Sequence, residues 1–221
     1  MKRLLLSLIL VLLANGCTTV PFRETERVPL SNESPQGLVL RFQEHMPGSF
    51  QLLNSIVFEY NWRTFAGIGY LGIDRRSNVF SVACLNPMGV KLFELSGDRD
   101  TVVTHYAIAD FSRYGDVAAI VGSDIRRIYF DLLPSPEARI WKRKYTISFR
   151  QPHGPGLLEY VFSGLQGDLI EKNYYEDDGI VWRASYYEYQ EDQGKRFPQG
   201  IIFQHYLYGY RLIVRQKELR V

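Results

Sequence analysis

Cysteine, histidine and net charge are all scarce in this chain of 221 residues, and each scarcity excludes a class of protein. Two cysteines, Cys17 and Cys84, are too few for the framework of disulfides that holds many small secreted domains. The four histidines lie at no spacing that suits a metal site. A net charge of +2 gives no reason to expect nucleic acid or another polyanion as a partner. We therefore expect neither a bound metal nor a cofactor.

Motifs of catalysis and nucleotide binding are also missing. The chain has no Gly-x-Ser-x-Gly sequence, and the glycines Gly67, Gly69 and Gly72 lie within a predicted strand, not between a strand and a helix. The acidic run 176–178 could hold calcium, but beside a glycine it is more typical of a solvated hairpin turn. Cys84 alternates with apolar residues and is interpreted as a buried thiol, with a reactive nucleophile as the alternative. We therefore expect a protein that is not an enzyme.

The N-terminus has the pattern of a secretory signal. A basic start is followed by an apolar run, Leu4 to Ala14, which is too short to span a bilayer as a helix. Residues 14–17 are similar to the lipobox of bacterial lipoproteins, in which cleavage before the cysteine leaves it as an acylated N-terminus. We predict a signal peptide over residues 1–16 and lipidation of Cys17; the alternative is ordinary cleavage and a soluble product. Loss of the signal removes two basic residues, which leaves 26 − 2 = 24 basic against 24 acidic ones.

The rest of the chain divides into a tether and one folded domain. Residues 17–34 contain prolines and small polar residues without a helix or strand period, which is typical of a tether. A Ser-Pro pair then resembles a helix start, and a short helix is predicted over residues 35–46. A second helix is predicted between residues 116 and 133. Residues 35–221 suffice for one sizeable core.

Outside these helices apolar residues alternate with a period of two, which indicates strands joined by short turns. One strand begins near Phe50, and the others are predicted over 63–74, 79–85, 90–95, 102–108, 140–150, 156–163, 168–176, 180–190, 200–207 and 208–214. About ten or eleven strands are more than an open sheet holds comfortably, so we predict that the sheet curls. The expected fold class is mainly β (α+β): a half-open, curved antiparallel β-barrel covered by one or two helices.

Tyrosine is abundant in the last part of the chain. Eight of the fifteen tyrosines fall in the last three predicted hairpin segments, and adjacent residues such as Tyr186 and Tyr187 must point to opposite faces of a sheet. One interpretation is a concave, largely apolar groove for a lipid-like ligand, lined by rings with polar tips. The alternative is that strands favour tyrosine and half-buried surfaces accept it.

The order of these features resembles the LolA/LolB family of periplasmic lipoprotein carriers. The turn with proline and glycine over residues 85–90, and the Gly-Asp turn at 97–98, are similar to turns of LolB-like members. The segment 197–203, which contains a proline, and the segment 210–214 are similar to the closing strands of the family. The resemblance covers most of residues 35–221.

This resemblance implies an apolar cavity for acyl chains, enclosed by the helical cover, in an outer-membrane lipoprotein that faces the periplasm. It implies attachment to the membrane through acylated Cys17, the acyl chain of a lipoprotein or lipid as ligand, and a LolA-like periplasmic carrier as a partner. The predicted cavity walls are Phe65, Ile68, Tyr70, Leu71, Phe80, Val82, Leu92, Ile120, Ile125, Ile128, Trp182 and Tyr186. The alternative for the helix residues among them is a place in the ordinary core.

Three functions stay open at this point. The first is an outer-membrane-anchored lipoprotein that binds acyl chains and acts in the transfer or localisation of lipoproteins or lipids. The second is a structural or assembly lipoprotein that binds a protein partner through an exposed strand edge. The third, a hydrolase of envelope material, would need a polar cleft with perturbed carboxylates or a histidine partner.

Overall fold

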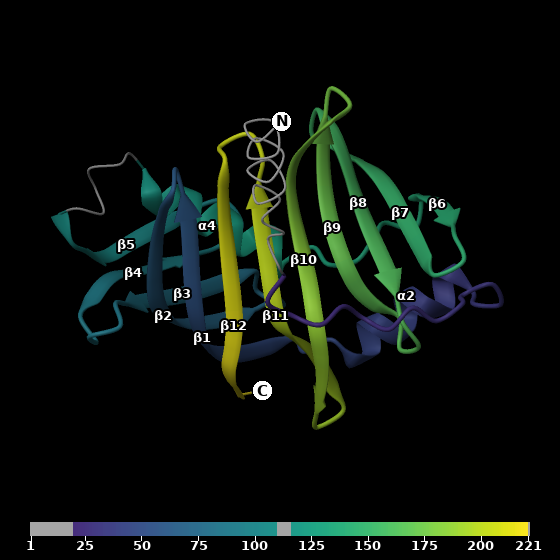
Figure 1. Cartoon of the computed structure of the whole chain (residues 1–221), viewed down its shortest axis with the longest axis horizontal. Coiled ribbons are helices and arrows are strands. Elements are labelled where there is room, and N and C mark those ends of the chain that lie inside the picture. The colour runs from purple at the N-terminus through teal and green to yellow at the C-terminus, as the bar shows by residue number, and fades with distance from the viewer. Residues whose placement is uncertain (1–19, 110–115, 221) are drawn as a thin grey trace, which may run out of the picture.

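The computed structural model describes residues 20–109 and 116–220, so the predicted signal over residues 1–16 and the predicted lipidation of Cys17 lie outside the described residues. The described chain forms one antiparallel sheet of twelve strands, with helices α2 and α4 (Figure 1). None of its helices is both long and apolar enough to cross a membrane. In chain order the elements are α2 (Pro35–His45), β1 (Ser49–Tyr60), β2 (Arg63–Asp74), β3 (Val79–Leu85), β4 (Lys91–Gly97), β5 (Val102–Ala107), α4 (Val117–Tyr129), β6 (Arg139–Lys142), β7 (Thr146–His153), β8 (Gly156–Ser163), β9 (Asp168–Glu176), β10 (Gly179–Asp192), β11 (Lys195–His205) and β12 (Tyr210–Arg220).

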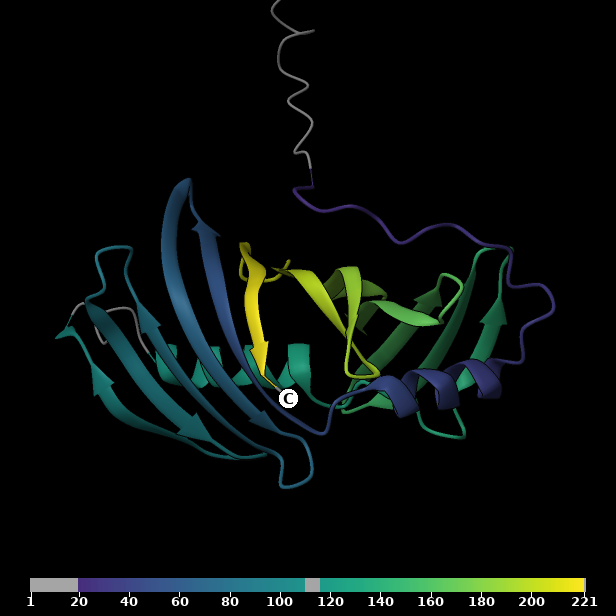
Figure 2. The same cartoon turned by 90° about the horizontal axis from the view of Figure 1, so that it is seen from below.

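The sheet consists of two meanders that meet in the middle. The strand order is β5-β4-β3-β2-β1-β12-β11-β10-β9-β8-β7-β6, so the first and last strands pair with each other, and β5 and β6 are the edges. Helix α4 connects these two edges along the chain, and it therefore crosses one face of the curved sheet (Figure 2). We call the face covered by α4 the inner face and the opposite one the outer face. The predicted half-open β fold with a helical cover is confirmed.

The strand boundaries differ from the prediction at one place that changes the strand count. The single strand predicted over residues 140–150 is a hairpin of β6 and β7, in which the N–H of Arg143 donates to the carbonyl of Thr146 at 2.9 Å. The turn residues between the two strands include no glycine, proline, asparagine or aspartate. No turn could therefore be predicted there, because glycine, proline, asparagine and aspartate are the residues that mark turns.

Helix α2 forms where it was predicted and lies on the same side of the sheet as α4 (Figure 2). The hydroxyl of Ser34 accepts a hydrogen bond from the N–H of Gly37 at 3.3 Å and so caps the N-terminus. The buried residues Leu38 and Phe42 pack the helix on the sheet, and the ring of Phe42 lies edge-on to Phe162 at 5.4 Å. Together the two helices cover both halves of the inner face.

The described part of the segment before α2 is packed on the domain, although the sequence predicted a tether over residues 17–34. Its described part has neither helix nor strand, as expected, but it runs along the outer face of the sheet (Figure 2). The ring of Phe22 stacks on Tyr187 at 5.4 Å and is 7% exposed. Leu30 is 2% exposed, and its N–H donates to the carbonyl of Lys144 at 2.8 Å. We call residues 20–33 the strap; burial of these two apolar side chains holds it on the sheet.

Candidate functional site: the inner face beneath helix α4

Helix α4 covers the place where a ligand cavity was predicted. Asp116 caps its N-terminus, where a carboxylate oxygen accepts a hydrogen bond from the N–H of Ala119 at 3.0 Å. Ile125 and Ile128 are 7% and 2% exposed and belong to the core, whereas Ile120 is 41% exposed. The helix predicted between residues 116 and 133 is therefore confirmed, and two of its three candidate residues face the sheet.

The predicted ligand residues fall into two groups, because strand side chains alternate between the two faces. The group buried together in one core with α4 consists of Leu71, Phe80, Val82, Ile125, Ile128, Trp182 and Tyr186. Ile68 and Tyr70 point to the outer face, since they alternate on β2 with the inward side chain of Leu71. Phe65 at the start of β2 is 40% exposed, and Leu92 is half-buried. Together with Ile120, these four residues lie apart from the common core.

Side chains fill the space between α4 and the sheet. The ring of Tyr129 on the helix lies 6.4 Å from the ring of Phe50 on β1, and Phe50 meets Phe197 on β11 at 4.8 Å. On the second half of the sheet, Trp182 stacks on Tyr174 at 5.8 Å. The apolar interior thus continues across both halves. Because a packed interior leaves few voids, a ligand could enter here only where side chains of α4 move away.

Three side chains from the sheet and its turns hold the C-terminal end of α4, and we call them the carbonyl clamp: Arg75, Lys172 and Tyr186. An α-helix leaves its last carbonyl groups without partners inside the helix. The clamp supplies those partners. Its bonds are Lys172 Nζ to Arg127 O (3.1 Å), Tyr186 Oη to Ile128 O (2.8 Å) and Arg75 Nε to Tyr129 O (2.9 Å).

Two members of the clamp are basic side chains beside the negative end of the helix dipole. Lys172 is 2% exposed, and burial lowers its pKa from 10.5 to about 7. Its ammonium lies 5.9 Å from the ring centres of Tyr160 and Trp182, which attract a cation over their faces. Loss of hydration also lowers the pKa of Arg75 to about 10, so its guanidinium stays charged at neutral pH. The clamp therefore places positive charge at the end of the covering helix.

A further polar contact joins the middle of α4 to β12. The hydroxyl of Tyr210 donates to the carboxylate of Asp124 at 2.6 Å, and Arg127 lies 3.0 Å from the other carboxylate oxygen. Burial raises the pKa of Asp124 to about 6. The imidazole of His205 next to Tyr210 is 1% exposed, and burial, with the charge of Arg127, lowers its pKa to about 4. Two groups with opposite pKa shifts thus lie close to the helix.

Sequence reasoning missed these polar residues. Arg75 lies in a turn between predicted strands, and neither Asp124 nor Lys172 was singled out. One signal was present for Lys172, because it shares a strand face with Tyr174, two residues further on, at a position where an apolar side chain is the norm. Which carbonyl groups such a side chain meets depends on tertiary packing.

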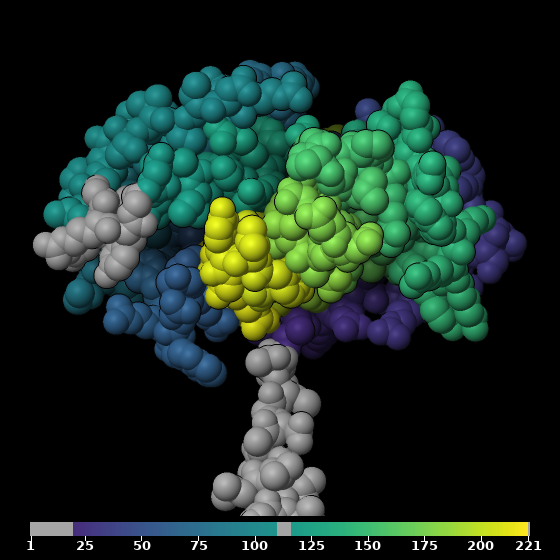
Figure 3. All heavy atoms as spheres, turned by 90° about the horizontal axis from the view of Figure 1, so that it is seen from above, coloured from purple at the N-terminus to yellow at the C-terminus, as the bar shows by residue number. Residues whose placement is uncertain are grey.

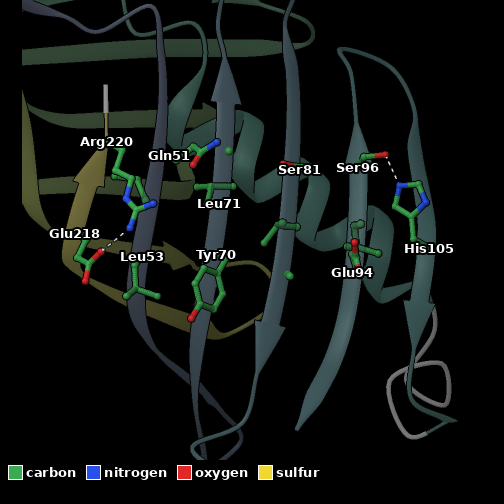
Figure 4. A pocket seen from close by; sticks show the side chains of 15 residues that line it. Gln51, Leu53, Tyr70, Leu71, Ser81, Glu94, Ser96, His105, Glu218 and Arg220 are labelled. Carbon is green, nitrogen blue, oxygen red and sulfur yellow. Dashed lines mark hydrogen bonds and ion pairs between the residues drawn. The ribbon is translucent and has the colours of Figure 1, made fainter. Parts of the chain in front are cut away.

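The outer face of strands β1 to β5 carries a groove of about 350 Å³ (Figure 4). In it the hydroxyl of Ser96 lies 2.7 Å from Nε2 of His105, and serine hydrolases contain a pair of this kind. Hydrolysis of that type also needs a carboxylate on the other ring nitrogen. Within residues 20–109 and 116–220 no carboxylate bonds that nitrogen, and nearby Glu94 is paired with Lys91 at 2.6 Å. The described residues of this groove do not complete a catalytic triad.

Two smaller predictions are confirmed. Cys84 is 2% exposed and burial raises its pKa to about 11, which is the state of a packed thiol. The acidic run forms the turn between β9 and β10, where Asp177 and Asp178 both have positive φ.

In the described part of the chain, no group of three or more His, Cys, Asp or Glu residues could hold a metal ion.

Comparison with solved structures identifies the architecture. No family model and no curated protein matches the sequence. A LolA superfamily protein from Nitrosomonas europaea superposes with a TM-score of 0.55 at 11% identity, over 84% of this chain and 92% of that one. The chain has a LolA-like fold. A DUF1329 family protein from Desulfovibrio piger shares it with a TM-score of 0.51 at 9% identity, over 83% of this chain and 90% of the other. In the LolA-like fold of this chain, α4 and the clamp occupy the inner face.

Proposed function

We propose that this LolA-like protein is an envelope lipoprotein that binds acyl chains between α4 and the sheet and acts in the transfer or localisation of lipoproteins or lipids. Acylated Cys17 attaches it to the outer membrane, with the domain facing the periplasm, and a LolA-like periplasmic carrier donates the acyl chain. The proposal does not include an enzymatic step. The observation that carries it is an open sheet with a continuous apolar core, one part of which lies beneath α4, a helix whose C-terminal end is held through polar contacts.

The apolar core supplies the free energy for binding. Burial of each acyl methylene contributes about 0.8 kcal/mol, so a long chain can replace the apolar contacts that α4 gives up when it moves. Leu71, Phe80 and Val82 on the sheet and Trp182 on its second half are the proposed walls, because they stay on the inner face when the helix leaves.

The carbonyl clamp makes movement of α4 reversible. Each of its hydrogen bonds contributes a net amount of about 1 kcal/mol, because water takes over the exposed groups when a bond opens. The clamp residues Arg75 and Lys172 are also charged or readily protonated, so hydration favours them in an open state. A closed form with the helix seated and an open form with an acyl chain in its place therefore differ by a moderate free energy.

A covalent lock between α4 and β5 tests the proposal. A Cβ added at Gly122 would meet the side chain of Val102 at closer than normal contact, so cysteines at these two positions are near enough for a disulfide. In the double variant Val102→Cys, Gly122→Cys we expect oxidation to abolish labelling by a photoactivatable palmitate, because α4 can no longer leave the sheet. Reduction should restore the labelling.

The two single cysteine variants are the matched controls, since they carry the same substitutions without the disulfide. In the reduced protein the label should map to peptides that contain Phe80, Ile125 or Trp182. Equal labelling of the oxidised and reduced double variant would count against acyl binding beneath α4.

A second candidate function is the binding of a protein partner along the free edge of β6. All four residues of this edge strand are exposed, including Ile140 at 39% and Trp141 at 43%. An open edge with exposed apolar side chains can take up a strand of another protein. Crosslinking from position 141 in cells that captured one protein stoichiometrically, without any bound acyl chain, would favour this function over the first.

A further inference from the structure

The strap determines where the N-terminal chain leaves the domain. The N–H of Arg23 donates to the carboxylate of Glu188 at 2.9 Å, and Arg215 donates to the carbonyl of Pro21 at 2.8 Å. The guanidinium of Arg215 also lies 4.5 Å from the ring centre of Phe22. Together with the stacking of Phe22 described above, these contacts bind the strap to the outer face from Pro21 onward.

The predicted anchor is close to this point. Thr18 and Thr19 alone separate Cys17 from Val20, the first described residue. Three residues span about 10 Å even when fully extended. An acylated Cys17 therefore stays within that distance of Val20, and the side of the domain that bears Val20 must lie near the bilayer.

A groove of about 650 Å³ on that side contains a fully exposed tryptophan. Val20 lines this groove together with Trp62, which lies in the turn between β1 and β2 and has a relative exposure of 106%. The φ angles of Asn61 and Trp62 are 45° and 62°, a region that favours glycine and is seldom adopted by a bulky residue. A large apolar side chain held in water on such a turn adds nothing to the core. It indicates a contact outside the domain.

The other lining residues match the chemistry of a membrane surface. Tyr60 and Tyr206, each 45% exposed, add rings with polar tips, and such rings and tryptophan prefer the level of the lipid headgroups. Figure 3 shows the first described residues, in dark purple, on the same side of the molecule as a protruding blue segment, with the yellow C-terminal strands between them. Val20, at the start of the strap, lines the same groove as these rings, so the groove and the start of the strap lie on one side of the domain.

Arginines add positive charge to the groove. Arg63, Arg183 and Arg211 line it, and arginine binds phosphate groups and anionic lipid surfaces. Arg183 and Arg211 also lie 3.8 Å and 3.7 Å from glutamate oxygens on neighbouring strands. The charge offered to a phosphate therefore comes chiefly from Arg63, which is next to Trp62 in the chain.

We propose that this groove and the Trp62 turn form the surface by which the domain lies on the phospholipid headgroups of the membrane that holds Cys17. The inference rests on one part of the proposed function, the acylation of Cys17, and is independent of acyl binding beneath α4. The anchor supplies the attachment, and the aromatic and basic groove supplies the orientation.

Tryptophan fluorescence in reconstituted vesicles tests this orientation. The mature lipoprotein is placed in vesicles of phosphatidylcholine and phosphatidylglycerol whose acyl chains carry bromine, which quenches nearby tryptophan. We expect lipid quenching in the wild type, loss of that quenching in Trp62→Phe and retention of it in Trp141→Phe, the control on the β6 edge. Unchanged quenching in Trp62→Phe would overturn the proposal.

A second pair of variants guards against a local effect of the Trp62 substitution. In the Trp62→Phe protein, Leu207→Trp in the neighbouring exposed turn should restore quenching, whereas Ile120→Trp on α4, on the inner side, should not. Equal quenching of the two would overturn the orientation. A further outcome would also overturn the proposal. If lipid does not quench Trp62, but another envelope protein protects it from quenching by iodide, the surface binds protein and not lipid.

The outcomes separate this proposal from acyl-cargo binding. If lipid quenches Trp62 but no palmitate probe labels the protein, the membrane-contact proposal is supported and acyl-cargo binding is rejected. A mature N-terminus without acyl groups, seen by mass spectrometry, would overturn the membrane surface, whatever the palmitate probe labels.

Discussion

The ammonium of Lys172 on β9 donates a hydrogen bond of 2.8 Å to the carbonyl of Phe130, the residue that follows α4, in the interior of the protein. The same ammonium also bonds the carbonyl of Arg127, one turn earlier. The second half of the sheet is thereby joined to the end of a helix whose middle packs against Val102 on β5, at the far edge. Movement of α4 has to break these bonds.

Stability should depend on pH through Lys172. The pKa of this lysine is lowered from 10.5 to about 7 by burial, so between these values the unfolded chain binds a proton that the folded chain lacks. The free energy of unfolding therefore increases with pH in this window. We expect Lys172→Met to reduce this increase by about 1 kcal/mol or more between pH 7 and 9, measured by urea unfolding. Lys217→Met, at an exposed position, should keep the wild-type dependence; the same dependence in Lys172→Met would contradict the assignment.

Asp124 and His205 should have opposite effects on stability in acid. The raised pKa of Asp124, about 6, means that the folded carboxyl takes up a proton first, so its contribution to stability grows as pH falls through 6. The lowered pKa of His205, about 4, means that the unfolded imidazole is protonated first, so stability is lost as pH falls from 6.5 toward 4. We expect Asp124→Asn to lose stability between pH 6.5 and 4.5 more steeply than the wild type. If the stability of Asp124→Asn changed less with pH than that of the wild type, the raised pKa of Asp124 would be contradicted.

Removal of Arg75 should loosen the end of α4. Its guanidinium bonds the carbonyls of Tyr129 and Pro47, at 2.9 Å and 2.6 Å, and these acceptors lose a charged donor in Arg75→Met. We expect the free energy for opening the last turn of α4 to fall by about 2 kcal/mol, seen as faster amide hydrogen exchange there. Arg76→Met in the same turn is the matched control, because Arg76 is exposed. Equal acceleration in both variants would point to the turn itself and not to the clamp.

Release of the strap should follow from Phe22→Ala. Truncation of this buried ring removes about 3 kcal/mol of packing, which raises the population of the detached strap about a hundredfold. Trypsin should then cut after Arg23 and Arg27 much faster, while the melting of the sheet changes little. Val20→Ala, at a position 43% exposed, should be cut at the wild-type rate. An unchanged rate in Phe22→Ala would mean that the hydrogen bonds alone hold the strap.

Local patterns in the sequence predicted most of the fold. The alternation of apolar residues located β2, β3, β8 and β9 to the residue, a Ser-Pro pair located the start of α2, and apolar spacings of three and four located α4. The hairpin of β6 and β7 was missed because its turn consists of residues that occur equally well in strands. The strap was missed because proline-rich, irregular chain is typical of a tether, and only the partner surface around Tyr187 shows why Phe22 is buried.

The candidate site was harder to predict than the fold. Period-two alternation separates the two faces of β2, but both faces carry apolar residues, so the sequence did not tell Leu71 from Tyr70. The carbonyl clamp could not be predicted from the sequence, because its hydrogen-bond acceptors are backbone carbonyls, which every residue has. Trp62 gave no signal either, since a tryptophan in a strand-rich segment is ordinarily interpreted as core. The inward face of β2, the carbonyl clamp and the exposure of Trp62 all depend on which elements of the fold lie next to each other.

The pairing of β1 with β12 has a consequence for biogenesis. The sheet is closed in its middle by segments about 150 residues apart in the chain, Ser49–Tyr60 and Tyr210–Arg220, a separation that makes folding slow. During synthesis the first meander would present β1 as an unpaired, apolar edge until the last strand arrives. A chain that is synthesised in N-to-C order can therefore not complete its sheet until nearly all of it has emerged, and during that interval a chaperone or a neighbouring copy can compete with β12 for the same edge.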